Sequence, residues 1–130
     1  MKKFLVSLLA LLGFGSNILF ANPIIDKAYQ EKKSDIQVEG SGKVVKILAD
    51  DNEWSLDQRF ILKLPSNLTS LVAHNIDLSQ RIEDLRAGDE VSFFGEYEWN
   101  KQGGVIHWTH HDPSKKHKDG WLKHKGKIYQ

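Results

Sequence analysis

Apolar and polar residues alternate in several short stretches of the chain, a pattern typical of β-strands that bury one face. The longest stretch covers residues 36–49, IQVEGSGKVVKILA, where Gly40 and Gly42 predict a bulge or a sharp bend. Further alternating stretches predict strands at residues 58–64, 68–76, 90–99 and 105–110, and a closing hairpin at residues 121–124 and 127–129. The pattern therefore predicts a mainly β fold with five principal strands.

Two stretches have helical spacing instead. Residues 22–35 predict a short helix or a loose lead-in to the domain. Residues 78–86 place Leu78, Ile82 and Leu85 on one helical face, which predicts a short helix between strands three and four. Five strands, a bent first strand and a helix at that position predict a small OB-like barrel over residues 36–130. An open β-sandwich or an SH3-like barrel is the alternative.

The first 21 residues have the character of a signal peptide. Lys2 and Lys3 precede an apolar run over residues 4–12, and Ala21 suits a cleavage site. A membrane anchor is the alternative, but the apolar run is short for a span of about 20 residues. We therefore expect a periplasmic or secreted protein. Cysteine is absent, so neither a lipid anchor on cysteine nor a disulfide is available, and the core must hold the fold.

The charge of the chain narrows the choice of partners. The formal net charge is +1, and without Lys2 and Lys3 sixteen basic residues face seventeen acidic residues. This balance excludes a globally basic nucleic-acid-binding protein. The charge is uneven, however, with six lysines in residues 114–130 and four acids in residues 50–57. Such runs can steer a ligand, although most are only solvated surface.

Residues 96–113, EYEWNKQGGVIHWTHHDP, concentrate chemically capable side chains around a Gly-Gly turn signal. If residues 100–103 form the hairpin loop, Glu96 lies opposite His107 and Gly95 lies opposite Trp108. A shift by one residue would break the apolar pairing. A carboxylate beside an imidazole raises the histidine pKa and orients the ring, so Glu96 and His107 are candidate catalytic residues. An ordinary surface pair is the alternative.

A second group of residues has the chemistry of metal ligands. His110, His111 and Asp112, completed by His74, are candidates for a divalent transition metal such as zinc. In an extended strand His107 and His111 would stand about 13 Å apart, too far to share one ion. A shared site therefore requires the strand to end or bulge near residue 109. Hydrogen-bonded histidines on a barrel face are the alternative.

Two classes of function follow from these residues. OB-like barrels bind oligonucleotides or oligosaccharides on aromatic platforms. The candidates for such binding are Trp54, Phe94, Trp108, Trp121 and Lys123, and the lysines of the tail could engage a polyanion. The sequence therefore favours a small binding or accessory protein. The alternative is a metal-dependent hydrolase of the phosphodiesterase or nuclease type that uses the histidine and aspartate cluster.

Four blocks resemble the signature of the bacterial domain-of-unknown-function family 3465. They are AHNIDL at residues 73–78, GEYEWN at 95–100, GGVIHWTHHDP at 103–113 and GKIYQ at 126–130, and Gly120-Trp121 also matches. Asp57 departs from the family pattern, which often has histidine before Gln-Arg-Phe. The resemblance implies a small secreted or periplasmic domain and supplies no activity.

Overall fold

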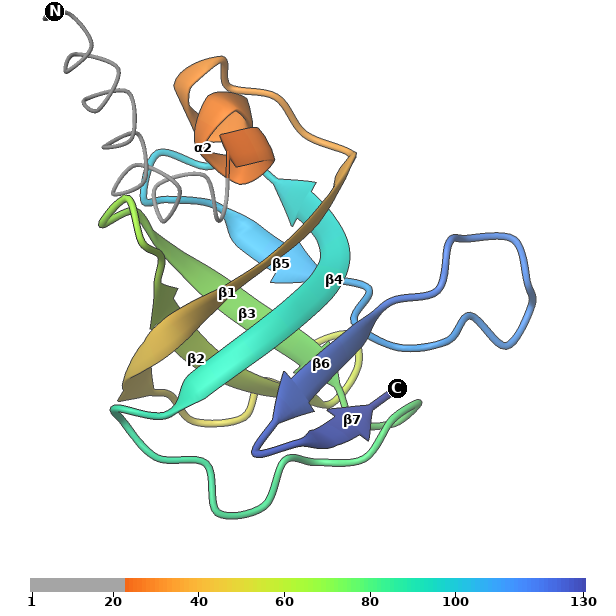
Figure 1. The fold of residues 1–130 in the computed structure, drawn as a ribbon. Coiled ribbons are helices and arrows are strands. Elements are labelled where there is room, and N and C mark those ends of the chain that lie inside the picture. The colour runs from red at the N-terminus through yellow and green to blue at the C-terminus, as the bar shows by residue number, and fades with distance from the viewer. Residues whose placement is uncertain (1–22) are drawn as a thin grey trace, which may run out of the picture.

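The computed structural model describes residues 23–130 and shows one helix and a single β-sheet (Figure 1). The helix is α2 (Pro23–Gln30), and the strands are β1 (Ile36–Ile47), β2 (Asp57–Lys63), β3 (Thr69–Asn75), β4 (Glu90–Glu98), β5 (Val105–His107), β6 (Trp121–His124) and β7 (Lys127–Tyr129). Within this part of the chain no helix is long and apolar enough to cross a membrane. The predicted leader over residues 1–21 lies outside the described residues.

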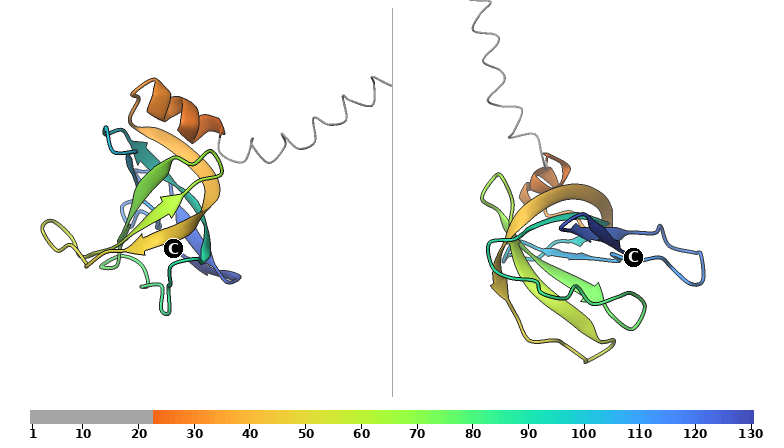
Figure 2. Two further views of the ribbon diagram at one scale, coloured as in Figure 1. Left: turned by 90° about the vertical axis from the view of Figure 1, so that its left-hand side faces the viewer. Right: turned by 60° about the horizontal axis from the view of Figure 1, so that its bottom comes forward.

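Five strands close into a barrel in the order β1-β2-β3-β5-β4, and β4 pairs back onto β1. The β3–β5 pair is parallel and the other pairs are antiparallel. The β6–β7 hairpin extends the sheet from β4, and α2 covers one end of the barrel (Figures 1 and 2). The predicted class, a mainly β five-stranded OB-like barrel, is confirmed.

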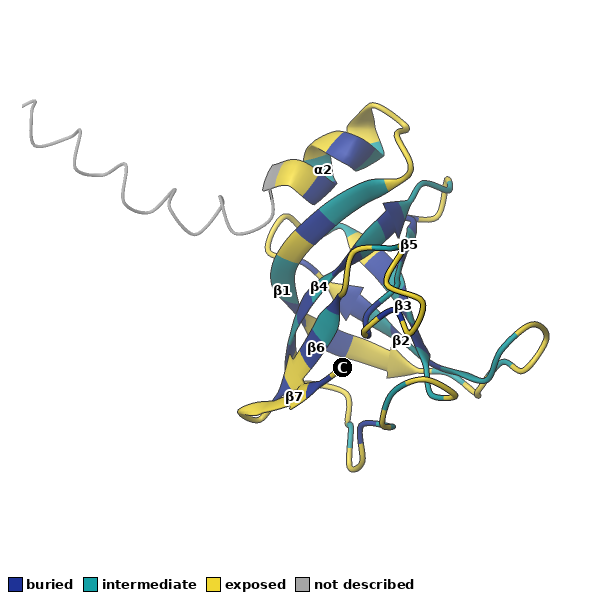
Figure 3. Ribbon diagram, turned by 90° about the vertical axis from the view of Figure 1, so that its right-hand side faces the viewer, coloured by how far each residue is buried: buried dark blue, intermediate teal, exposed yellow. Residues whose placement is uncertain are grey.

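Along the strands, buried and exposed residues alternate because successive side chains point into the core and out of it. In β4 the odd-numbered positions are buried and the even-numbered positions are partly exposed or exposed (Figure 3). The largest fully buried side chains include Tyr97, Phe60 and Phe93, and α2 adds Ile25 to the same core. Because a strand side chain reverses face at each residue, this core leaves Phe94, Glu96 and Glu98 on the outer surface.

The first strand bends, as the sequence predicts, but the bulge lies beyond the two glycines. β1 pairs with β4 up to Lys43 and with β2 from Lys43 onward, and the register shifts between Val44 and Lys46. Gly42 is needed for close packing, since a Cβ there would lie 2.8 Å from the Lys63 carbonyl oxygen. One strand thereby serves two neighbours and closes the barrel.

The helix predicted at residues 78–86 is wrong: this segment forms turns. Side chains of the barrel form hydrogen bonds with the backbone groups of this segment. The Gln58 amide accepts from the Ile82 N–H and donates to the Ile82 carbonyl, both at 2.9 Å. His74 bonds the Gln80 carbonyl at 2.9 Å. These contacts replace the bonds that a helix would make within itself, and the helix of the described chain is α2.

The strand predicted over residues 105–110 ends at His107. Trp108 adopts a left-handed backbone conformation with φ of 56°, which turns the chain out of the sheet. The predicted pairing of Gly95 with Trp108 therefore does not form. A Cβ on Gly95 would instead meet the His107 carbonyl oxygen at 2.5 Å and the Thr109 side chain at 3.0 Å. The chain then leaves the barrel as a long loop and returns as β6 (Figure 2).

Candidate functional site

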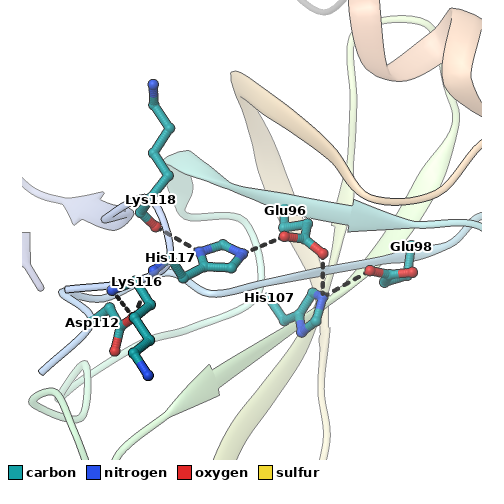
Figure 4. A network of polar contacts seen from close by, with 7 residues as sticks. All are labelled: Glu96, Glu98, His107, Asp112, Lys116, His117 and Lys118. Atoms are coloured by element: carbon teal, nitrogen blue, oxygen red, sulfur yellow. Dashed lines mark hydrogen bonds and ion pairs between the residues drawn. The ribbon is translucent and has the colours of Figure 1, made fainter. Parts of the chain in front are cut away.

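The outer face of β4 and β5 carries a group of two carboxylates and one imidazole. Glu96 pairs with His107 across the two strands, which confirms the predicted register. The His107 Nε2 atom lies 3.4 Å from a Glu98 carboxylate oxygen and 3.9 Å from a Glu96 carboxylate oxygen (Figure 4). One possible ligand atom from each of Glu96, Glu98 and His107 lies within 4.8 Å of the others. Within residues 23–130 these three residues are therefore spaced closely enough to share one metal ion.

His117 joins this group from the long loop between β5 and β6. Its Nε2 bonds a Glu96 carboxylate oxygen, and its Nδ1 donates to the Lys118 carbonyl at 2.8 Å (Figure 4). The ring stacks on Trp108, with centroids 3.8 Å apart and planes 6° from parallel. Since both nitrogens have acceptors, the imidazolium form fits this arrangement best. His117 is not among the residues predicted from the sequence, because 21 residues separate it from Glu96.

Asp112 organises the loop that presents His117. Its carboxylate accepts the backbone N–H groups of Ser114, Lys116 and His117 at 2.7–2.9 Å. These bonds, led by the one from His117, hold the pKa of Asp112 well below its usual range. The role of Asp112 in this structure is therefore to fix the loop.

The electrostatics of the group differ from the simple expectation of a raised histidine pKa. Burial lowers the pKa of His107 and outweighs the opposing charge of Glu96. Burial and hydrogen bonds shared with Glu96 and Asp35 raise the pKa of Glu98 to about 7. Burial would raise the pKa of Glu96 as well, but hydrogen bonds, above all that from His117, lower it.

The pKa of His117 moves in the opposite direction to that of His107. Burial favours its neutral form, but the bonds to Lys118 and Glu96 outweigh burial and raise the pKa. The site thus combines a neutral imidazole, His107, with an ion pair between His117 and Glu96.

A pocket of about 220 Å³ also borders His107. Its lining residues are Ser55, Asp57, Ala73, Asn75, Leu78, His107, Trp108 and His110. The Ser55 hydroxyl donates to the Asp57 carboxylate at 2.9 Å. The pocket therefore offers several polar groups next to His107.

The predicted metal ligands do not come together as one set. His74 is buried, and its Nε2–H donates to the Gln80 carbonyl while its Nδ1 accepts from the Thr109 hydroxyl at 2.8 Å. Burial, the largest cause, lowers the pKa of His74 to about 4, which keeps the ring neutral. Both nitrogens are thus occupied by protein groups.

The other members of that set bond protein groups or face solvent. His110 is buried and its Nδ1 donates to the His111 carbonyl at 2.8 Å. The His111 side chain is exposed, and the Asp112 carboxylate binds the loop. The structure therefore gathers metal-ligand chemistry at Glu96, Glu98 and His107 instead of at the four residues that the sequence suggests.

Two of the predicted binding aromatics lie side by side. Phe94 and Trp121 face each other across β4 and β6, with ring centroids 6.1 Å apart and planes at 29°. Lys123 pairs with Ser92 two residues further along the same face. Next to them lies a shallow depression of about 450 Å³, lined by Glu39, Gly40, Ser41, Ser92, Trp121 and Lys123.

The remaining aromatic candidates have other surroundings. Trp54 is 93% exposed in the segment between β1 and β2. Trp108 lies against His117 on one side and contacts His110, with ring centroids 5.2 Å apart. Trp108 therefore supports the loop, and Phe94 with Trp121 forms the aromatic surface.

The closed barrel, its strand order and the parallel β3–β5 pair define a small OB-like domain of the mainly β class. The chain belongs to the family described as Protein of unknown function (DUF3465), whose model matches residues 8–130. A comparison with curated proteins found no match to this sequence.

Proposed function

We propose that this protein is a periplasmic or secreted binding or accessory domain whose ligand is an oligosaccharide. The binding surface, here called the platform, consists of Glu39, Ser41, Ser92, Phe94, Trp121 and Lys123. The observation that carries the proposal is the Phe94–Trp121 pair, held on two adjacent strands of the barrel. The location rests on the signal-peptide character of residues 1–21.

The platform has the physical properties that sugar binding requires. The apolar face of a sugar ring stacks on an aromatic ring, while its hydroxyl groups need donors and acceptors at the edge. Cross-strand register places Glu39 opposite Phe94, and Lys123 opposite Ser92. Because the Phe94 and Trp121 rings already pack against each other on paired strands, they lose little conformational entropy when a ligand binds. Aromatic stacking beside fixed polar groups therefore supports an oligosaccharide ligand.

Charge favours an oligosaccharide over a polyanion on this surface. Glu39 lines the same depression as Lys123. Glu96 is the next residue after Phe94 on the outer face of β4. A phosphate backbone would meet both carboxylates, whereas a neutral sugar can accept hydrogen bonds from the ammonium and donate to the carboxylates. Nucleic-acid binding would further show a steep loss of affinity with salt.

The proposal is tested by glycan-array screening of residues 23–130, followed by calorimetry on the best ligand. We expect Trp121→Ala to weaken binding by about tenfold or more, as for loss of one stacking partner. Trp54→Ala is the matched control, because it removes a tryptophan that is 93% exposed and lies outside the platform. Absence of glycan binding, or equal affinities of the two variants, would reject the proposal. Salt-sensitive binding of single-stranded DNA would favour a polyanion ligand instead.

A metal-dependent hydrolase is the second candidate. The observation that favours it is the pocket of about 220 Å³ that borders His107 and contains Asp57 and His110. A metal ion could activate water there, and a carboxylate or imidazole could move its proton. Hydrolysis of bis(p-nitrophenyl) phosphate with added Zn²⁺ or Mn²⁺ tests this function. Activity that His107→Ala abolishes and His111→Ala retains would support it, and no activity would count against it.

A further inference from the structure

We infer that Glu96, Glu98 and His107 bind one divalent transition-metal ion, for which Zn²⁺ is the probe. This site lies on β4 and β5, beyond the platform, and does not depend on the binding of an oligosaccharide. It also stands whether or not the protein hydrolyses a substrate, because it concerns the affinity for the ion alone.

The distances within the group suit a single ion. Zinc binds nitrogen and oxygen ligands at about 2.1 Å, so tetrahedral ligand atoms stand about 3.4 Å from one another. The His107 Nε2 atom lies 3.4 Å from the Glu98 oxygen and 3.9 Å from the Glu96 oxygen. All three ligand atoms lie within 4.8 Å of one another. Small rotations of the glutamate side chains therefore suffice to bring them to bonding distance.

The register of the barrel fixes this arrangement. Glu96 is directly paired with His107 between β4 and β5, and Glu98 is the next outward residue of β4. Sites on paired strands are more rigid than sites on loops. The three ligands are thus preorganised before an ion arrives.

The charges of the group also favour a cation. Two carboxylates lie beside each other on a partly buried surface, and among residues 23–130 no lysine or arginine forms an ion pair with either. His117 pairs with one Glu96 oxygen only, so the other Glu96 oxygen and the Glu98 carboxylate are left to face the ion beside His107. The imidazole selects transition metals over Mg²⁺ and Ca²⁺, which prefer oxygen ligands alone.

His117 acts as a positioning residue for this site. It bonds one oxygen of the Glu96 carboxylate, while the other oxygen of the same carboxylate faces His107 (Figure 4). Its own ring is held by the stack on Trp108 and by the Lys118 carbonyl. Hydrogen bonds of this kind orient metal ligands and typically change metal affinity by about 10- to 100-fold.

A second, independent feature lies beside the group. Gln37 pairs with Glu96 across β1 and β4, and its amide nitrogen is buried with no hydrogen-bond partner in the described part of the chain. Three protein ligands leave a fourth coordination position to water. Such a water would offer this donor an acceptor. The His107 side chain is 34% exposed, so an ion can enter from solvent.

The test is isothermal titration of untagged, chelator-treated protein with Zn²⁺, with metal analysis after dialysis. We expect one ion per chain, and a loss of affinity of more than about a hundredfold in His107→Ala and in Glu98→Gln. His117→Gln should weaken binding by about 10- to 100-fold and keep the one-to-one ratio. His111→Ala is the matched control, because it removes an exposed imidazole outside the group.

Circular dichroism confirms that each variant is folded, and NMR of the intact protein supplies a measurement without mutation. Zn²⁺ should shift the imidazole signals of His107 first. Failure of the protein to bind Zn²⁺, or binding that His111→Ala removes and His107→Ala keeps, would overturn the inference. Trp121→Ala should retain full Zn²⁺ affinity, which separates this result from the test of the platform.

Discussion

His117 and Glu96 form an ion pair on the barrel surface although 21 residues and a loop separate them in the sequence. The pair links a side chain of the β5–β6 loop to the outer face of β4. Through this contact the conformation of the loop affects the position of the Glu96 carboxylate.

Glu96→Gln should lower the pKa of His117 in metal-free protein. Hydrogen bonds and charge from Glu96 help to raise this pKa, so removing the negative charge destabilises the imidazolium form. NMR titration of the imidazole protons measures the change. Glu83→Gln, a change of an exposed carboxylate, is the control. An unchanged His117 pKa would mean that the pair does not form in solution.

Asp112→Ala should loosen the loop that carries His117. The Asp112 carboxylate accepts the N–H groups of Lys116 and His117, and alanine leaves them to solvent. Hydrogen exchange of these two amides should become faster by about tenfold or more, while the barrel amides keep their rates. Asp119→Ala, which removes one bond to the Asp112 N–H, should have a smaller effect. Equal rates in wild type and Asp112→Ala would contradict this role.

Acid should destabilise the protein through His74. Its pKa is about 4 in the folded state against 6.5 as the ordinary value, so the unfolded chain binds more protons between these values. Stability is fully present above pH 6.5 and falls as the pH drops toward 4, by up to about 3 kcal/mol. Urea unfolding across this window measures the slope. In His74→Gln the slope should be shallower, whereas His111→Gln should leave it unchanged.

The fold was largely predictable because each strand buries one face, so alternation reveals both the strands and their inward residues. The β4–β5 register followed from the same rule, since a shift would place Glu98 against Ile106. The segment at residues 78–86 could not be predicted, because its backbone is bonded by Gln58 and His74 from other strands. Its apolar residues have helical spacing, but contacts with the rest of the barrel determine its conformation.

In the candidate site, only the contacts between paired strands could be predicted from the sequence. The contact between Glu96 and His107 required no more than a register. The contact with His117 depends on a left-handed turn at Lys115, with φ of 57°, and on hydrogen bonds from Asp112. Loop geometry of this kind is set by several weak contacts together, and no short sequence pattern encodes it.

Gln58→Leu should destabilise the fold by about 2 kcal/mol or more, because it leaves the buried N–H and carbonyl of Ile82 without partners. Urea denaturation measures the change. Gln102→Leu, a change of an exposed glutamine in the hairpin loop, should alter stability by less than about 0.5 kcal/mol. A small effect of Gln58→Leu would show that the segment does not need this anchor.

Gly95→Ala should lower stability by about 1–3 kcal/mol, because its Cβ would lie 2.5 Å from the His107 carbonyl oxygen and force the two strands apart. Gly126→Asn is the control, since nothing lies within 4 Å of a Cβ there and asparagine tolerates its φ of 82°. Thermal unfolding distinguishes the two variants. Similar melting temperatures would show that β4 and β5 can separate at low cost.

Gly95 marks a division in β4. On one edge of this strand β5 pairs with residues 96–98 and β6 pairs with residues 91–94, so the chain leaves and rejoins the same edge. The loop between β5 and β6 is therefore an insertion into a continuous sheet border, and loop length is thermodynamically inexpensive to change. A loop of another length or sequence between β5 and β6 would leave the strand order of the barrel unchanged. The barrel would then stay the same while evolution or protein engineering replaces the loop residues that lie beside His107.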